Sequence, residues 1–176
     1  TNNRGLIAKN AMVVSAREEA SKIGVEILKQ GGNAFDAMMA TEMALAVAYP
    51  YAGNLGGGGF LVYRLADGSK GGLDYREKAP LASKKDMYLD ENGDIIEGKS
   101  TIGSMAVGIP GTIAGIFEAQ KRFGKLDVAA ILKPVIKLAK NGYIITEKQE
   151  YRIEHYDSLI TAVNEKEILY NQKLKA

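Results

Sequence analysis

The sequence predicts an α+β fold, because helical and strand-like patterns follow one another irregularly along it. Several long segments have apolar residues at helical spacing, and several short ones are apolar or alternating and are bounded by turn residues. The short segments come in pairs joined by turns, which argues against a regularly alternating α/β sheet. With 176 residues, of which 46% are hydrophobic, the chain is long enough for a core. We therefore expect residues 1–176 to form a single domain.

The N-terminal part predicts a strand and then a helix. The apolar run 11–16 (AMVVSA) is typical of a short buried strand. Residues 17–29 carry an apolar stripe at helical spacing, with acidic residues in the first turn and Lys29 in the last, as the helix dipole favours. The glycines at 31–32 provide the usual C-terminal stop.

A second helix is predicted over residues 34–49, with Asn33 or Asp36 as its cap. Only Asp36 and Glu42 are charged within it, and Pro50 ends it. A helix that is apolar nearly all round is usually buried. We expect this helix to lie in the core.

Four consecutive glycines, residues 56–59, precede the predicted strand 60–65, and the turn 66–69 leads into a returning strand, 70–77. A phosphate-binding loop would need a Lys after the glycines, and a dinucleotide fingerprint would need a strand before them and a helix after them. Neither pattern is present. We interpret the glycines as a tight turn that lets a strand pass through a crowded core beside the functional site.

The remaining segments predict a turn, an extended stretch and three helices. They are the turn 89–94, the extended stretch 103–112, a helix from Pro110 to Gly124, a helix over 127–142 that contains Pro134, and a helix that begins at Thr146.

Composition argues against several classes of function. The net charge is +2 without a basic stripe, so we expect no nucleic-acid binding. The absence of Cys excludes disulfides and zinc–sulfur sites, and one His cannot form a His-rich metal site. No apolar run approaches the roughly 18 residues of a membrane span, and the first ten residues lack the pattern of a signal peptide. We expect no metal and no cofactor.

The chain offers no convincing nucleophile–base pair. Ser15, Ser104 and Thr112 lie near glycines or strand ends, but no Gly-x-Ser-x-Gly motif surrounds them. His155 lies in a mixed-charge segment that is typical of a solvated helix face. Thr1 has the position of an N-terminal nucleophile, but no strand pattern follows it, so we interpret it as a processed end. We therefore expect no catalytic residue in this chain.

The most informative charged cluster is the stretch LDYREKAP, residues 73–80. On a strand, Asp74 and Arg76 share one face, so Asp74 is placed to hold Arg76. An oriented guanidinium is a good clamp for a substrate carboxylate, because its fork matches two oxygens. A structural ion pair would produce the same pattern, and spacing alone leaves both interpretations open.

Five stretches together resemble one family. They are ILKQGGNAFDAMMA, PYAGNLGGGGF, LDYREKAP, GSMAVGIPGTIAGIFEA and ILKPVIKLAKNGYIIT. In this order and with this spacing they closely resemble the large subunit of gamma-glutamyltransferases, also called gamma-glutamyltranspeptidases or glutathione hydrolases. The resemblance extends from about residue 8 to residue 146.

The resemblance implies an N-terminal-nucleophile hydrolase fold, a four-layer αββα sandwich, of which this chain is the N-terminal portion of the large subunit. The family's precursor cuts itself, and the new N-terminal Thr of the small subunit attacks the gamma-glutamyl amide. Water or an amino acid then resolves the glutamyl-enzyme. Arg76, in DYRE, would bind the α-carboxylate of the glutamyl group, with Asp74 supporting it.

The implied partners are the small subunit and a gamma-glutamyl substrate such as glutathione, and the implied location is the periplasm or the cell exterior. Two alternatives within the fold are a poly-gamma-glutamate capsule transpeptidase and an acylase for other amides. A third alternative, from a different class, is a non-catalytic binding or scaffold module.

Overall fold

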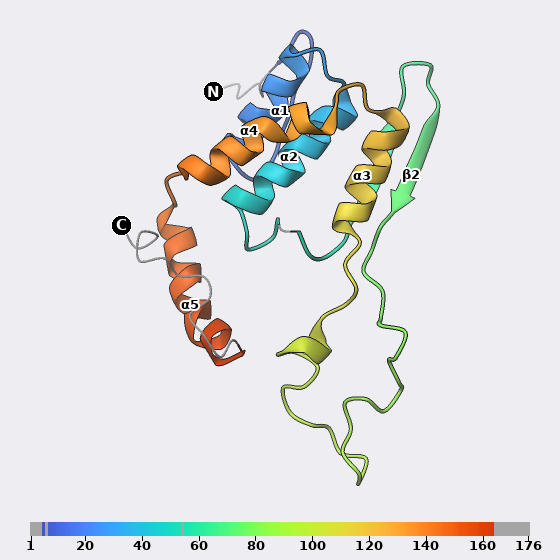
Figure 1. Ribbon diagram of the computed structural model, residues 1–176, viewed down its shortest axis with the longest axis vertical. Helices are drawn as coiled ribbons and strands as arrows, with labels where there is room; N and C mark the ends of the chain where they lie inside the picture. The colour runs from blue at the N-terminus through green and yellow to red at the C-terminus, as the bar shows by residue number, and fades with distance from the viewer. Residues whose placement is uncertain (1–4, 6, 54, 164–176) are drawn as a thin grey trace. The chain divides into compact units, whose positions relative to one another are not determined.

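The computed structural model describes residues 5, 7–53 and 55–163. Its elements, in chain order, are α1 (Glu18–Lys29), α2 (Ala34–Ala48), β1 (Phe60–Arg64), β2 (Lys70–Asp74), the 3₁₀ turn η1 (Ser104–Ala106), α3 (Thr112–Phe123), α4 (Val128–Asn141) and α5 (Glu147–Val163) (Figure 1). Thr1 lies outside the described residues. The mixture of helices with a hairpin confirms the predicted α+β class.

The described chain divides into two compact units. One contains the described residues up to Pro80 together with Gly108–Tyr143, and the other contains Leu81–Val107 together with the described residues from Ile144. The first unit holds α1–α4 and the hairpin, and the second holds η1 and α5. That both units belong to one domain stays a prediction.

The core of the first unit surrounds α2, which packs against α1, α3 and α4. Because helices cover it on several sides, α2 buries residues around most of its circumference, as its apolar sequence predicted. Each large apolar side chain that is removed from water stabilises the fold by about 1.5–3 kcal/mol. The buried core cluster consists of Ala20, Ile23, Ile27, Met39, Ala40, Ala44, Ile116, Ile131 and Val135.

Both residues that were predicted as caps of α2 take part in one capping box. The Asn33 Oδ1 accepts hydrogen bonds from the N–H groups of Phe35 (2.9 Å) and Asp36 (3.2 Å), and Asp36 Oδ2 accepts one from the N–H of Asn33 (2.9 Å). The buried Asp36 carboxylate also accepts hydrogen bonds from the N–H groups of Lys125 and Leu126. It thereby ties the start of α2 to the turn between α3 and α4.

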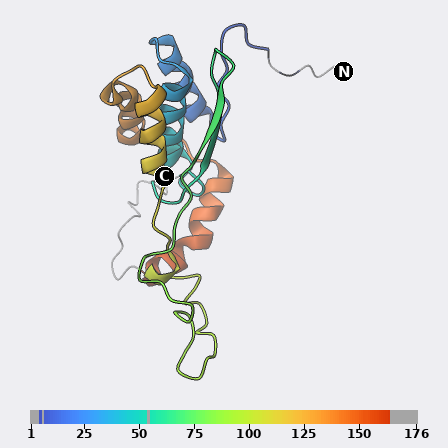
Figure 2. The same cartoon turned by 90° about the vertical axis from the view of Figure 1, so that its right-hand side faces the viewer.

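The hairpin is antiparallel, and its register pairs Phe60 with Asp74 and Arg64 with Lys70. Its inner face contributes Tyr63, whose ring packs against the rings of Phe35 and Phe123. Figure 2 shows the hairpin edge-on, alongside the helices of its unit. The returning strand ends at Asp74, earlier than predicted, although the N–H of Tyr75 still donates to the carbonyl of Gly59 at 3.0 Å.

Two predicted extended segments are wrong. Residues 11–16 form no strand and are half-buried only at Val13 and Ser15, because none of the described segments pairs with their backbone. Apolar composition alone does not supply those hydrogen bonds. Residues 103–112 contain the turn η1, and within them only Ile109 makes a strand-like bridge, to Lys78.

The helices of the C-terminal half are confirmed. Asp127 caps α4 by accepting a hydrogen bond from the N–H of Ala129 at 2.7 Å, and Pro134 lies inside that helix. The Thr146 hydroxyl accepts one from the N–H of Gln149 at the start of α5. His155 lies on the exposed surface of α5, as expected. The predicted turn at 89–94 is closed by an isolated bridge between Leu89 and Ile95.

None of the helices in the described part of the chain is long and apolar enough to cross a lipid bilayer. Across the same residues, no cluster of three or more His, Asp or Glu side chains has an arrangement that could hold a metal ion.

Candidate functional site

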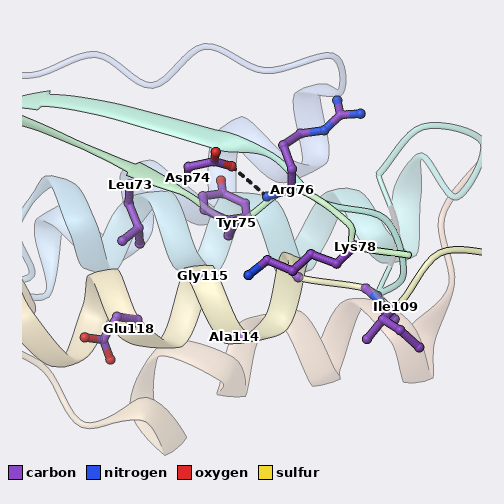
Figure 3. Close-up of a pocket in the computed structure, with 11 residues that line it drawn as sticks. Leu73, Asp74, Tyr75, Arg76, Lys78, Ile109, Ala114, Gly115 and Glu118 are labelled. Carbon is purple, nitrogen blue, oxygen red and sulfur yellow. Dashed lines mark hydrogen bonds between the residues drawn. The ribbon is translucent and has the colours of Figure 1, made fainter. Parts of the chain in front are cut away.

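The candidate site lies where β2 ends, at residues 74–77. Asp74 is the last residue of β2, and its Oδ1 accepts a hydrogen bond from the main-chain N–H of Arg76 at 3.0 Å (Figure 3). An aspartate that bonds to the N–H two residues on is a common turn-stabilising arrangement. Asp74 therefore fixes Arg76 through its main chain, while the Arg76 side chain points away from the Asp74 carboxylate. A role of either residue in substrate binding stays a prediction.

The Arg76 guanidinium has two neighbours among the described residues. Its Nε lies 3.2 Å from Oε2 of Glu77, and its Cζ lies 5.7 Å from the centroid of the Phe60 ring. The side chain is 60% exposed. The guanidinium is thus held beside the strand, but it remains accessible to a ligand.

One oxygen of Glu77 is unusual. Its Oε2 is covered, yet it accepts no hydrogen bond from any donor in the described chain. The nearby Nε of Arg76 supplies positive charge at 3.2 Å without the alignment that a hydrogen bond requires. The interaction is therefore mainly electrostatic, and for pairs this exposed it contributes about 0–1 kcal/mol to stability.

A pocket of about 410 Å³ lies between the end of β2 and α3. Its volume is within the range of small-molecule sites. It combines an apolar wall with charged groups from both sides. The lining residues are Leu73, Asp74, Tyr75, Arg76, Lys78, Ile109, Pro110, Gly111, Ala114, Gly115 and Glu118 (Figure 3).

The glycine loop packs directly against the turn at 74–77, although none of its four glycines is fully buried; that it borders a glutamyl pocket stays a prediction. A Cβ on Gly58 would come within 2.7–2.8 Å of the main chain of Tyr75, Arg76 and Glu77. Only glycine permits this approach. The carbonyl of Gly57 also accepts hydrogen bonds from the N–H groups of Gly111 (2.8 Å) and Thr112 (3.2 Å). These amides at the start of α3 are therefore occupied by the loop itself.

Tyr75 links the loop to α3. A Cβ on Gly59 would lie 2.7 Å from the Tyr75 ring, and one on Gly115 would clash with Cγ, Cδ1 and Cβ of Tyr75. Burial raises the pKa of the Tyr75 phenol, and the charge of Glu42 adds to the increase. The phenol is therefore neutral at physiological pH and acts as a packing group.

The hydroxyl groups that were considered as nucleophiles are engaged in structural contacts. Ser15 donates to the carbonyl of Arg17, and Thr112 donates to the carbonyl of Gly56 at 2.7 Å. Ser104 begins the turn η1 in the other unit. In the described ranges, no His, Asp or Glu side chain bonds to the hydroxyl of Ser15 or Thr112.

Phe60 lies beside Arg76, and sequence reasoning did not single it out. Its pairing with Asp74 places its ring next to the turn that carries Arg76. The signal was available in principle, because a short turn at 66–69 fixes which residues face each other across the hairpin.

Comparison with known proteins decides the family. Residues 20–175 match the family model described as Gamma-glutamyltranspeptidase. The chain belongs to this family. Its relatives include proteins named glutathione hydrolase proenzyme from Pseudomonas sp. (strain A14), 52% identical over 140 residues, and from Pseudomonas aeruginosa, 50% identical over 141 residues. Each alignment covers 80% of this chain but only 24% and 25% of the respective relatives. This chain therefore spans about a quarter of their length.

Solved structures confirm the fold. A gamma-glutamyltranspeptidase from Helicobacter pylori superposes with a TM-score of 0.84 at 42% identity, over 89% of this chain and 45% of that one. The transpeptidase CapD from Bacillus anthracis shares the fold at 23% identity with a TM-score of 0.70, over 96% of this chain and 49% of that one. A cephalosporin acylase from Bacillus halodurans shares 27% identity with a TM-score of 0.69, over 93% of this chain and 32% of that one. The chain is part of an N-terminal-nucleophile hydrolase fold.

Proposed function

We propose that the complete protein containing this chain cleaves gamma-glutamyl amides such as glutathione and transfers the glutamyl group to water or an amino acid. The observation that carries the proposal is the identity of about half to proteins named glutathione hydrolase proenzyme, over most of this chain. The DYRE turn lies inside the matched residues.

The part of this chain in the reaction is substrate binding by Arg76. Its guanidinium is exposed at the end of a strand, and its main chain is fixed by Asp74 and crowded by Gly58. A guanidinium can bind a carboxylate with two parallel hydrogen bonds. We assign Arg76 to the α-carboxylate of the glutamyl group and Asp74 to holding the turn that presents it.

The nucleophile belongs to another segment of the protein. The relatives' names describe proenzymes, which supports processing of this protein into a large and a small subunit. The hydroxyl of an N-terminal Thr on the small subunit attacks the gamma-carbonyl carbon, and the amine leaves with a proton. Water or an amino acid then attacks the resulting glutamyl ester and regenerates the hydroxyl.

The alternatives are less well supported. The transpeptidase CapD and the cephalosporin acylase share the fold at 23% and 27% identity, well below the values for the glutathione hydrolases. A non-catalytic module would lack the downstream segment that carries the Thr. Expression of the complete coding sequence and detection of self-cleavage on a denaturing gel separates the module from an enzyme.

We also place the complete protein in the periplasm or at the cell exterior. A chain without Cys is compatible with an oxidising compartment. Fractionation of cells that express the complete protein tests this location, and recovery only with cytoplasmic markers contradicts it.

The test of function uses the complete, processed protein and a chromogenic gamma-glutamyl anilide. The wild type should release the chromophore, and Arg76→Ala should raise KM about ten- to a hundredfold, because a charge-assisted pair is lost. Lys70→Ala is the matched control, since it removes a positive charge at the other end of the same strand. An unchanged KM in Arg76→Ala would remove Arg76 from the clamp.

A further inference from the structure

We propose that Phe60 and Glu77 are positioning residues for the Arg76 guanidinium, which lies over the Phe60 ring and has its Nε beside the Glu77 carboxylate. The inference rests on the proposed role of Arg76 in binding the glutamyl carboxylate. It assigns two further side chains to the specificity of the same site, and neither needs to contact the substrate.

The position of Phe60 follows from the hairpin. As the first residue of β1 it pairs with Asp74, the last residue of β2, so its ring lies beside the turn at 74–77. The ring is 64% exposed and takes no part in the buried core cluster. Its centroid lies 5.7 Å from Cζ of Arg76, which is within cation–π range. The ring therefore limits rotation of the guanidinium about the Arg76 side-chain bonds.

The position of Glu77 is set by its crowded main chain and stem. A Cβ on Gly58 would lie 2.7 Å from the N of Glu77, and one on Gly108 would lie 3.1 Å from its Cβ. Two glycines thus allow neighbouring segments to close around this residue. Its covered Oε2 has no described hydrogen-bond donor and lies 3.2 Å from Nε of Arg76. The Arg76 guanidinium is therefore the group that compensates this charge.

These two contacts leave a specific part of the guanidinium for a ligand. A carboxylate can bind side-on, through Nε and one amino group, or end-on, through both amino groups. The Glu77 carboxylate lies 3.2 Å from Nε and repels a second carboxylate at that edge, so the end-on arrangement is favoured. Loss of either contact releases the fork to rotate, and some of the order needed for two parallel hydrogen bonds is lost.

The experiment compares two donors in the complete, processed protein. One is a gamma-glutamyl anilide, and the other is the 4-aminobutanoyl anilide, which lacks the α-carboxylate. Phe60→Leu should raise KM for the glutamyl donor about two- to fivefold, the range of an exposed cation–π contact, and leave KM for the other donor unchanged. Phe60→Tyr keeps the ring, so the ratio of the two KM values, for the 4-aminobutanoyl donor over the glutamyl donor, should equal that of the wild type. Glu77→Gln should also raise KM for the glutamyl donor and so lower this ratio.

Val62→Leu is the matched control, because Val62 lies on the same exposed face of β1, two residues farther along. If Arg76→Ala abolishes the preference for the glutamyl donor and Phe60→Leu behaves like Val62→Leu, the positioning role is overturned and the clamp stands. If Arg76→Ala leaves the preference intact, the proposed role of Arg76 fails and this inference fails with it. Equal effects of Phe60→Leu on both donors would indicate a purely structural role and also overturn it.

Discussion

At the scale of single residues, different parts of Arg76 have different neighbours. Its main-chain N–H donates to Asp74, its Nε lies beside the Glu77 carboxylate, and its Cζ lies over the Phe60 ring. The main-chain contact is independent of the side chain, but a planar, delocalised cation can meet the carboxylate and the ring with different parts, whereas an ammonium group is a single point charge. The arrangement therefore depends on arginine itself and would not be served by positive charge alone.

Arg76→Lys tests this dependence. The variant keeps the charge but loses the fork that forms two parallel hydrogen bonds, so KM for a gamma-glutamyl donor should rise about tenfold. Steady-state kinetics of the complete protein measure it. Arg64→Lys, at the far end of β1, serves as the control. Wild-type KM in the Arg76 variant would show that charge suffices.

Asp74 provides a second test at this scale. Its Oδ1 is the acceptor for the N–H of Arg76, so Asp74→Ala should raise KM for the donor about fivefold, as expected for one hydrogen bond of about 1 kcal/mol. Asp74→Asn retains an acceptor oxygen and should remain closer to the wild type. If the two variants are equally impaired, the effect comes from the charge of Asp74 and not from this hydrogen bond.

At the scale of elements, one carboxylate organises the junction of three helices. The Asp36 side chain is fully buried and accepts hydrogen bonds from the N–H groups of Asn33, Lys125 and Leu126. It completes the cap of α2 and also fixes the turn between α3 and α4. Asp36, which is not part of the candidate site, therefore helps to fix the position of α3, the helix that lines the pocket.

Asp36→Ala should lower the free energy of unfolding by about 3 kcal/mol or more, because several buried N–H groups lose their acceptor. Chemical denaturation of the complete protein measures the change. Asp127→Ala removes an exposed cap of α4 and should cost only about 1 kcal/mol. A smaller loss for Asp36 than for Asp127 would contradict the organising role.

The contact between α3 and the end of β2 is equally specific. Gly115→Ala places a methyl group against Cγ and Cβ of Tyr75, closer than van der Waals contact allows, so overpacking of about 1–3 kcal/mol should exceed the gain of about 1 kcal/mol in helix propensity. Thermal unfolding should show a lower midpoint. Tyr75→Leu combined with Gly115→Ala should be less destabilised than the sum of the single variants. Strict additivity would mean that the two residues are not in contact.

At the scale of the whole molecule, the described chain leaves several large apolar side chains exposed to solvent. Several large apolar residues are more than three quarters exposed, and they include members of both units and of the outer face of the hairpin. They are Ile7, Val14, Val62, Leu81, Ile95 and Ile144. The chain also spans only about a quarter of its relatives. Contacts with the remainder of the protein would cover such surface.

The isolated chain 1–176 should therefore bind a hydrophobic dye more strongly than the complete protein, and it should release no chromophore from a gamma-glutamyl anilide. Carboxylate binding alone cannot supply the roughly 8 kcal/mol or more by which enzymes lower barriers. Dye fluorescence and a parallel activity assay check both statements. Turnover by the isolated chain would overturn the placement of the nucleophile on another segment.

Local signals in the sequence predicted the helices well. The stripe of α1, the capping box of α2 and the Asp127 cap of α4 each depend on residues within a few positions of one another. The extended segments were harder to predict. Residues 11–16 have a strand-like composition, but a strand also needs a partner backbone, and none of the described segments pairs with them.

By itself, the sequence determined the helices, the hairpin, the family and the choice of Arg76 as the residue of interest. Periodicity, caps and motif order depend only on the order of residues along the chain, so they can be read without knowing the fold. The tertiary structure decided that Asp74 bonds to the main chain of Arg76 and that Phe60 and Glu77 flank the guanidinium. Side-chain direction depends on strand register and on neighbours brought close by folding, and these are long-range properties.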